Sequence, residues 1–119
     1  MATIILRETE GRPLTYAEVD GNFTNLNNDK SITRSINQLI KFFGGIDILV
    51  SNAGSAFQGS IASIKEKVIR DSFDINFFSH QKISQKVVNI MKTQKTGGSI
   101  MFNISKQAVN PGKDFGPYG

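Results

Sequence analysis

The sequence contains no cysteine and no tryptophan, and its one histidine is His80. Without cysteine there can be no disulfide, no thiolate-bound zinc and no thiol catalysis. The absence of cysteine does not distinguish an oxidising from a reducing compartment. A single histidine excludes a metal site built from several imidazoles. No apolar run is long enough to span a membrane. The opening MATIILRETE carries charges where a signal peptide needs a longer apolar stretch. These absences predict a cytoplasmic chain without a bound metal.

The sequence also lacks a concentrated block of charge of either sign. The 14 Lys and Arg residues against 10 Asp and Glu give a net charge of +4. The basic residues are scattered rather than gathered in a block, a distribution typical of solvated helix faces and not of a nucleic-acid surface. At 119 residues, with 39% hydrophobic and 20% charged content, the chain has the composition of one compact globular domain. We expect neither nucleic acid nor membrane among its partners.

The first 30 residues predict a strand and a short helix. Residues 3–7 (TIILR) are apolar and β-branched, as in a strand. Thr15 and Glu18 have the spacing of a capping box. Apolar residues then recur at helical spacing, which predicts a helix over 16–27.

The rest of the chain predicts a βαβ unit. A helix begins near Ser31 and ends at Gly44-Gly45, and residues 46–50 (IDILV) follow as a buried strand. A loop of small residues covers 51–63, and residues 64–94 keep a helical period. Residues 99–104 (SIMFNI) form a second strand, which should run parallel to the first with a right-handed crossover. The tail 106–119 is predicted to be a loop.

Three stretches resemble the short-chain dehydrogenases/reductases. FGGIDILVSNAG is similar to their "fG.iDilVnNAG" signature, and FDINFFSHQKISQKVVNIM is similar to the helix that follows it. GGSIMFNISKQAVNPGKDFGPYG is similar to the strand and loop that carry the family's serine and tyrosine. The resemblance covers residues 32–119 and is nearest to sugar-metabolising members, including dehydrogenase halves of aldolase/dehydrogenase fusions. It implies a truncated Rossmann-like α/β fold whose small, mainly parallel sheet is completed by the N-terminal strand and by oligomerisation.

The resemblance also implies roles for single residues. Ser105 matches the serine that positions a substrate carbonyl, Tyr118 matches the acid/base, and Asn76 matches the asparagine that holds a proton-relay water. The segment that steadies the central sheet beside the cofactor is matched by Asn52, Ala53 and Gly54.

The sequence departs from the family pattern in three places. The family's lysine falls four residues after the tyrosine, and this sequence ends one residue after Tyr118. There is no glycine-rich turn for a dinucleotide and no acidic residue for its ribose. Since an ordinary tyrosine has a pKa of about 10 and a nearby cation favours its phenolate, catalysis would need a substitute cation. Lys106 and Lys113 are the local candidates. Without one, we expect Tyr118 to be an ordinary phenol at a frayed end.

The segment RPLTYAEVDGNFTNLNND resembles one that recurs near the start of bacteriophage tail and neck proteins. It predicts a gene fusion, with a phage-like leader over 1–30 and a dehydrogenase-like segment over 31–119 that together form one domain. A generic capped helix is the alternative.

Side-chain alternation predicts how the sheet is covered. One face should pack under the two long helices, which lie on the same side; its residues would be Ile46, Ile48, Val50, Ile100, Phe102 and Ile104. Two parallel strands alone have two open edges; the strand over 3–7 could cap one of them, and the other edge, or both, could pair with a second copy. We therefore expect a homo-oligomer, most simply a dimer, formed through sheet edges or through helix 64–94. Whether Phe77 and Phe78 belong to that interface or to the core is left open.

Two functions follow from this pattern. The first is a non-catalytic phage structural or interaction protein without a cofactor, in the host cytoplasm or the virion, in which the serine and tyrosine are relics and other phage structural proteins are partners. The alternative is an oxidoreductase or cofactor-binding module that uses NAD or NADP and is completed by oligomerisation or by a partner. A third reading is a trimmed piece of a longer dehydrogenase.

Overall fold

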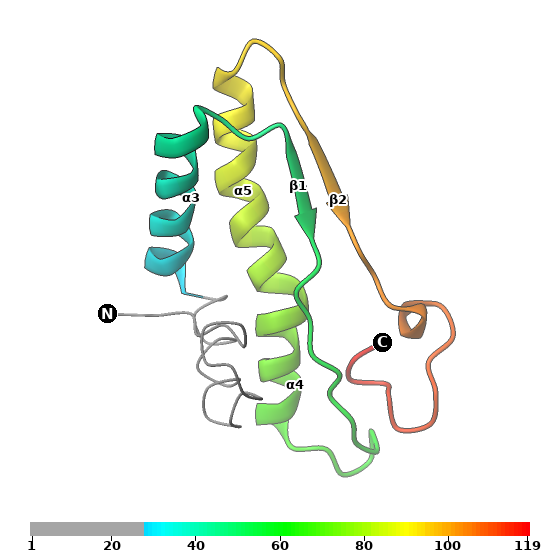
Figure 1. Cartoon of the computed structure of the whole chain (residues 1–119). Coiled ribbons are helices and arrows are strands. Elements are labelled where there is room, and N and C mark those ends of the chain that lie inside the picture. The colour runs from blue at the N-terminus through cyan, green and yellow to red at the C-terminus, as the bar shows by residue number, and fades with distance from the viewer. Residues whose placement is uncertain (1–27) are drawn as a thin grey trace, which may run out of the picture.

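The computed structural model describes residues 28–119. The strand predicted over 3–7 and the helix predicted over 16–27 lie outside this range. Figure 1 shows the described elements in order along the chain. They are α3 (Asp29–Phe43), β1 (Ile48–Ser51), α4 (Glu66–Phe73), a π-helical turn η1 (Asp74–Phe78), α5 (Ser79–Thr93), β2 (Ser99–Phe102) and a 3₁₀ turn η2 (Lys106–Ala108).

The two strands pair in parallel, with Ile48 opposite Ser99 at one end and Ser51 opposite Phe102 at the other. The helical stretch from α4 to α5 connects them (Figure 1). This is the predicted βαβ unit, and the α/β fold class is confirmed.

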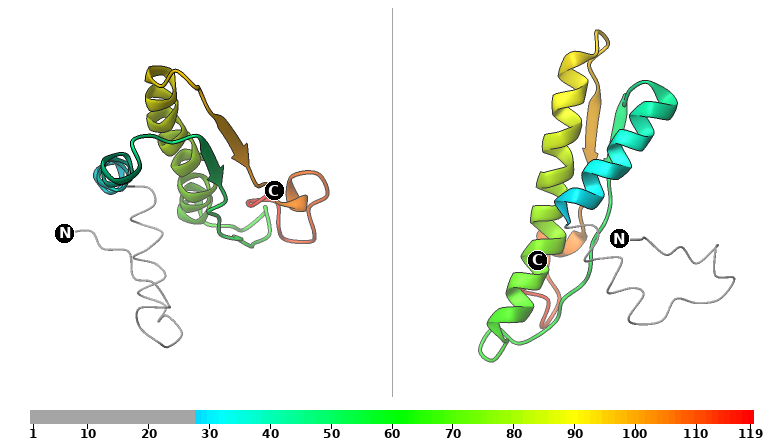
Figure 2. Two further views of the ribbon diagram at one scale, coloured as in Figure 1. Left: turned by 45° about the horizontal axis from the view of Figure 1, so that its top comes forward. Right: turned by 90° about the vertical axis from the view of Figure 1, so that its left-hand side faces the viewer.

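α3 and α5 cover the same side of the sheet, as the right-handed crossover rule predicts. Figure 2 shows both helices on one side of the strands. Their contact forms a core of four buried residues, against which Leu49 and Ile100 pack. These core residues are Ile32, Ile36, Val87 and Met91.

Helix α3 begins two residues earlier than predicted. The side chain of Asn28 accepts a hydrogen bond from the backbone N–H of Ser31 at 3.1 Å and so caps the helix. At the other end, Gly44 takes φ 80°, the left-handed conformation that glycine adopts without strain, and its N–H bonds to the Ile40 carbonyl. The predicted end at Gly44-Gly45 is therefore confirmed.

The predicted facing of the first strand is wrong. Ile48 and Val50 are 67% and 56% exposed, whereas Leu49 packs on the core and Ser51 is buried. The reason is a bend at Asp47, which changes the phase of the alternation after Ile46. Ile46 still reaches the core, but from irregular backbone.

In the second strand the predicted facing holds for Ile100, which packs against the core. Ile104 is 73% exposed, contrary to the prediction. The strand ends at Phe102, so its alternation does not extend to Ile104.

The tail after the second strand is not frayed. The N–H groups of Tyr118 and Gly119 both donate to the Phe115 carbonyl, at 3.0 and 2.9 Å. Across the molecule, the N–H of Gly59 donates to the Asp114 carbonyl at 2.8 Å. These bonds fold the tail back against the loop that follows β1, so the frayed end expected from sequence is corrected.

Candidate functional site

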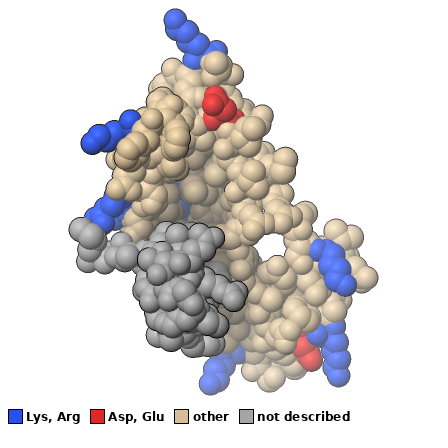
Figure 3. Space-filling view, in the orientation of Figure 1, with Lys and Arg blue, Asp and Glu red and all other residues tan. Residues whose placement is uncertain are grey.

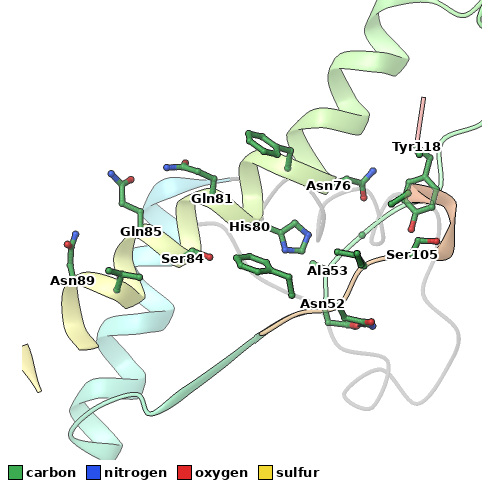
Figure 4. A pocket seen from close by; sticks show the side chains of 18 of the residues that line it. Asn52, Ala53, Asn76, His80, Gln81, Ser84, Gln85, Asn89, Ser105 and Tyr118 are labelled. Atoms are coloured by element: carbon green, nitrogen blue, oxygen red, sulfur yellow. Dashed lines mark hydrogen bonds between the residues drawn. The ribbon is translucent and has the colours of Figure 1, made fainter. Parts of the chain in front are cut away.

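A groove of about 1070 Å³ runs along α5, past the ends of both strands, to the chain terminus. Figure 4 shows that Ser105 and Tyr118 lie at one end of it and Asn89 at the other. All six residues singled out by the resemblance line this groove: Asn52, Ala53, Gly54, Asn76, Ser105 and Tyr118. The structure therefore brings together the residues that the sequence predicts to be functional.

The carboxyl ends of the two strands are joined by polar groups. The N–H of Asn103 donates to the Ser51 carbonyl at 3.1 Å, which extends the ladder by one residue. The Asn103 side-chain amide donates to the side-chain oxygen of Asn52 at 2.5 Å. Because parallel strands end at the same edge of a sheet, these bonds fix where the segments leading to Gly54 and Ser105 enter the groove.

Asn76, in the π-helical turn, holds the loop after β1. Its side-chain oxygen accepts from the N–H of Ser55 at 3.0 Å, and its side-chain nitrogen donates to the Ser55 carbonyl at 2.9 Å. A Cβ on Gly54 would lie 3.2 Å from that oxygen, so the glycine permits the close approach. The amide therefore supports the backbone beside Gly54 rather than pointing into open groove.

Ser105 begins the 3₁₀ turn after β2. Its Oγ accepts a hydrogen bond from the Gln107 N–H at 3.2 Å. The carboxamide oxygen of Gln107 in turn accepts from the N–H of Gly112 at 2.6 Å, which closes the loop beyond. Accepting a bond uses a lone pair of the hydroxyl and leaves its hydrogen to donate to a ligand in the groove.

Tyr118 is half-buried, and its ring lies 6.5 Å from that of Phe115 between ring centres. The backbone just before it is anchored, because the Ser72 hydroxyl donates to the Pro117 carbonyl at 3.0 Å. Figure 4 shows the phenol at the Ser105 end of the groove. The phenol of Tyr118 and the hydroxyl of Ser105 therefore line the same end of the groove.

His80 also lines the groove. Its Nδ1 is hydrogen-bonded to the Ser51 hydroxyl at 2.5 Å, and its ring meets Phe102 edge-on at 6.2 Å. The pair ties α5 to the end of β1. No local spacing joins residues 51 and 80, so no pattern in the sequence could have signalled this contact.

The helical wall of the groove was also missed. Polar and small apolar side chains on one stripe of α5 line it: Gln81, Ser84, Gln85, Val88, Asn89 and Lys92. Their recurrence every three or four residues is a signal that could have found them. Phe77 lines the groove too and is 56% exposed, and Phe78 is 44% exposed, so neither is a core residue of the described chain.

The substitute cations expected from sequence are not at the site. Neither Lys106 nor Lys113 lines the groove. Lys92 does, but it comes three residues after Asn89 on α5. Asn89 itself lies at the end of the groove away from Tyr118 (Figure 4). On the face seen in Figure 3, the basic side chains of the described residues lie apart around the rim and form no patch.

Within residues 28–119 no group of three or more His, Asp and Glu side chains could hold a metal ion. The helices in that range are each too short or too polar to cross a membrane.

The comparisons with known proteins agree with this geometry. The model of the short chain dehydrogenase family matches residues 7–119. The chain belongs to the short-chain dehydrogenase family. The match reaches into residues 1–30, where the sequence suggests a phage-like leader, and the comparisons give a fusion no support.

Two members of the family are similar to this chain in sequence. The human "Dehydrogenase/reductase SDR family member 4" is 38% identical over 86 residues, which are 71% of this chain and 31% of the relative. A 3alpha-hydroxysteroid dehydrogenase of Mediterraneibacter gnavus is 31% identical over 100 residues, 84% of this chain and 39% of the relative. The chain thus spans about a third of the length of these curated relatives.

A solved structure shares the fold. It is a 7 alpha-hydroxysteroid dehydrogenase complexed with NADH and 7-oxo glycochenodeoxycholic acid, 26% identical in sequence, with a TM-score of 0.70. The superposition covers 78% of this chain and 36% of that one.

Family members of this kind bind a nicotinamide dinucleotide, and the residues present fit only part of one. Its pyrophosphate needs a glycine-rich turn that opens a helix, and the 119 residues hold no G-x-G-x-x-G. In the loop before α4, the Ser55 N–H is already donated to Asn76. A whole dinucleotide therefore does not fit this chain alone.

Proposed function

We propose that this chain supplies the substrate side of an oxidoreductase that interconverts a small carbonyl and its alcohol. The observation that supports the proposal is the opening of the Ser105 and Tyr118 side chains on one groove, beside Asn52, Ala53 and Gly54. The Asn76 amide holds the loop that follows Gly54, and the Ser72 hydroxyl holds the backbone just before Tyr118.

The chemistry follows from the groups themselves. Ser105 donates its hydroxyl hydrogen to the carbonyl oxygen and so polarises the bond. Tyr118 gives its phenolic proton to that oxygen as the carbonyl becomes an alcohol, and takes it back in the reverse direction. The reducing equivalent would come from NADH or NADPH. The contacts of a glycine-rich turn would be made by a partner of different sequence, since that turn is not in this sequence.

A titration with reduced nicotinamide mononucleotide tests the proposal, because this probe carries the reactive ring without the second nucleotide. In amide NMR spectra of the full chain we expect shifts at Asn52, Gly54, Ser105 and Tyr118, with a Kd of about millimolar because few contacts are available. Tyr118→Phe should weaken the shift at Ser105, and Lys113→Ala, whose residue lies outside the groove, is the matched control. If saturating probe leaves these amides unmoved, the proposal fails.

A non-catalytic interaction protein is the second candidate. The exposed apolar face of β1 favours it, because Ile48 and Val50 present a surface suited to another protein. On this proposal the chain self-associates or binds a partner, the mononucleotide shifts no groove amide, and Ser105 and Tyr118 are relics. Phage structural partners and a place in the virion remain predictions from the sequence.

A further inference from the structure

We propose that Ser72 is a positioning residue that holds Tyr118 at the groove, linking it to Asn76 through one buried hydroxyl. Ser72 lies in the last turn of α4, outside every stretch that carries the family resemblance of the site. Only 2% of its surface is exposed. It is not a groove-lining residue itself, so any effect on the site passes through other groups.

The hydroxyl of Ser72 both accepts and donates a hydrogen bond. It accepts from the side-chain nitrogen of Asn76 at 3.1 Å, one helical turn along the chain. It donates to the Pro117 carbonyl at 3.0 Å, 45 residues away. A buried serine more often bonds back to its own helix, as Ser79 does to the Ile75 carbonyl.

A hydrogen bond to the Pro117 carbonyl directly restrains the backbone of Tyr118. The carbonyl belongs to the peptide plane that leads directly into Tyr118, and this plane is rigid. The proline ring fixes its own φ, so a bond to its carbonyl also fixes the orientation of the Tyr118 backbone. The tail is anchored again at Asp114, whose carbonyl accepts from Gly59, but that bond lies four residues before Tyr118.

Asn76 completes the connection. The same amide nitrogen that donates to Ser72 also donates to the Ser55 carbonyl, while the amide oxygen accepts from the Ser55 N–H. One asparagine and one serine therefore tie three segments together: the loop after β1, the helix, and the tail that carries Tyr118. The functional meaning of this tie rests on the proposed function, but the tie itself can be measured without any activity.

Amide hydrogen exchange in the full chain tests the proposal. Tyr118 and Gly119 both donate to Phe115, so their exchange reports whether the tail is closed. In Ser72→Ala we expect both amides to exchange about tenfold faster, because a buried hydrogen bond is lost and the Pro117 carbonyl is left unpaired. Val87, in the core, should keep its rate.

Two variants sharpen the test. Ser79→Ala removes another buried hydroxyl, which donates to the Ile75 carbonyl one turn back in the same helical stretch, and it should leave Tyr118 and Gly119 unchanged. Ser72→Thr keeps the hydroxyl and should restore their slow exchange. If Ser72→Ala does not fold, Ser72→Cys takes its place, since a thiol is a weak donor of similar shape.

The proposal is overturned if the tail amides keep their rate without the hydroxyl, or if Ser72→Ala and Ser79→Ala speed up exchange throughout the chain alike. The outcome separates it from the proposed function. If the tail amides exchange faster in Ser72→Ala but the mononucleotide shifts no amide of the parent chain, the positioning role of Ser72 stands and the proposed function is rejected. If the mononucleotide shifts the groove amides but the tail amides of Ser72→Ala keep their exchange rate, the proposed function stands and the positioning role of Ser72 is rejected.

Discussion

At the scale of single residues, one glutamine joins the two segments that lead into β1 and β2. The Gln94 side-chain oxygen accepts from the Ile46 N–H at 2.7 Å. Its nitrogen donates to the Ile46 and Gly97 carbonyls at 3.0 and 3.1 Å. A Cβ on Gly45 would come within 2.5 Å of that oxygen, so the glycine leaves the space that the glutamine occupies. The entries to both strands are held by this one side chain.

Removing this side chain should therefore lower stability without touching the core. For Gln94→Ala we expect a loss of about 2 kcal/mol in the free energy of unfolding, because three partly buried backbone groups lose their partner. Urea denaturation followed by circular dichroism measures it. Gln85→Ala, an exposed glutamine on the same helix, should change stability by less than about 0.5 kcal/mol. Equal losses in the two variants would contradict this account.

At the scale of elements, α5 connects the core, the sheet and the groove. Val87 and Met91 pack against α3, and Lys86 pairs with Asp29 at 2.9 Å beside them. On its other faces the helix bonds to β1 through His80 and lines the groove with its polar stripe. A change in how α3 and α5 pack would therefore be felt at the site.

Val87 is the best residue with which to test the packing, since it is only 1% exposed. Val87→Ala removes two methyl groups and leaves a cavity that the helices cannot fully close, so we expect a loss of about 2 kcal/mol in unfolding free energy. Val109→Ala is the matched control, because Val109 is 85% exposed. Thermal and urea unfolding measure both, and a neutral Val87→Ala would show that α3 does not pack as described.

At the scale of the whole molecule, the helices of residues 28–119 cover one side of the sheet (Figure 2). The apolar residues of the other side are exposed: Ile48, Val50 and Met101, at 67%, 56% and 61%. Such a surface is typical of an interface. The sequence predicted a homo-oligomer from open sheet edges, and the structure adds this face as a surface that association would bury.

We expect the parent chain to self-associate and the double variant Ile48→Lys, Val50→Lys to weaken that association by at least tenfold, roughly the effect of exposing one buried aliphatic side chain. Two ammonium groups on the face cannot be desolvated without a partner charge. Sedimentation velocity over a range of concentrations measures the effect. Val109→Lys, at an exposed site on the tail, should associate like the parent. A parent chain that stays monomeric at every concentration would contradict the prediction.

Much of the fold could be read from local patterns. The end of α3 was signalled by Gly44, and the parallel pairing of β1 with β2 followed from the order of a strand, a long helix and a second strand. Helical periodicity found α4 and α5 but not the π-helical turn between them, because one extra residue in a turn barely disturbs an apolar period. The candidate residues Ser105, Asn76 and Tyr118 were found only by the similarity of their sequence motifs to those of the family and by the spacing between them.

The sequence by itself determined which elements form and which residues carry candidate chemistry, because caps, glycine stops and apolar periods act over a few residues. Tertiary structure decided the rest. The bend at Asp47 set which face of β1 is buried, and bonds over 21 to 48 residues placed Asn76, Ser72 and Gln94. It also folded the tail that carries Tyr118 back onto the molecule. Contacts of this range depend on where the packed helices bring the backbone, and no local spacing records that position.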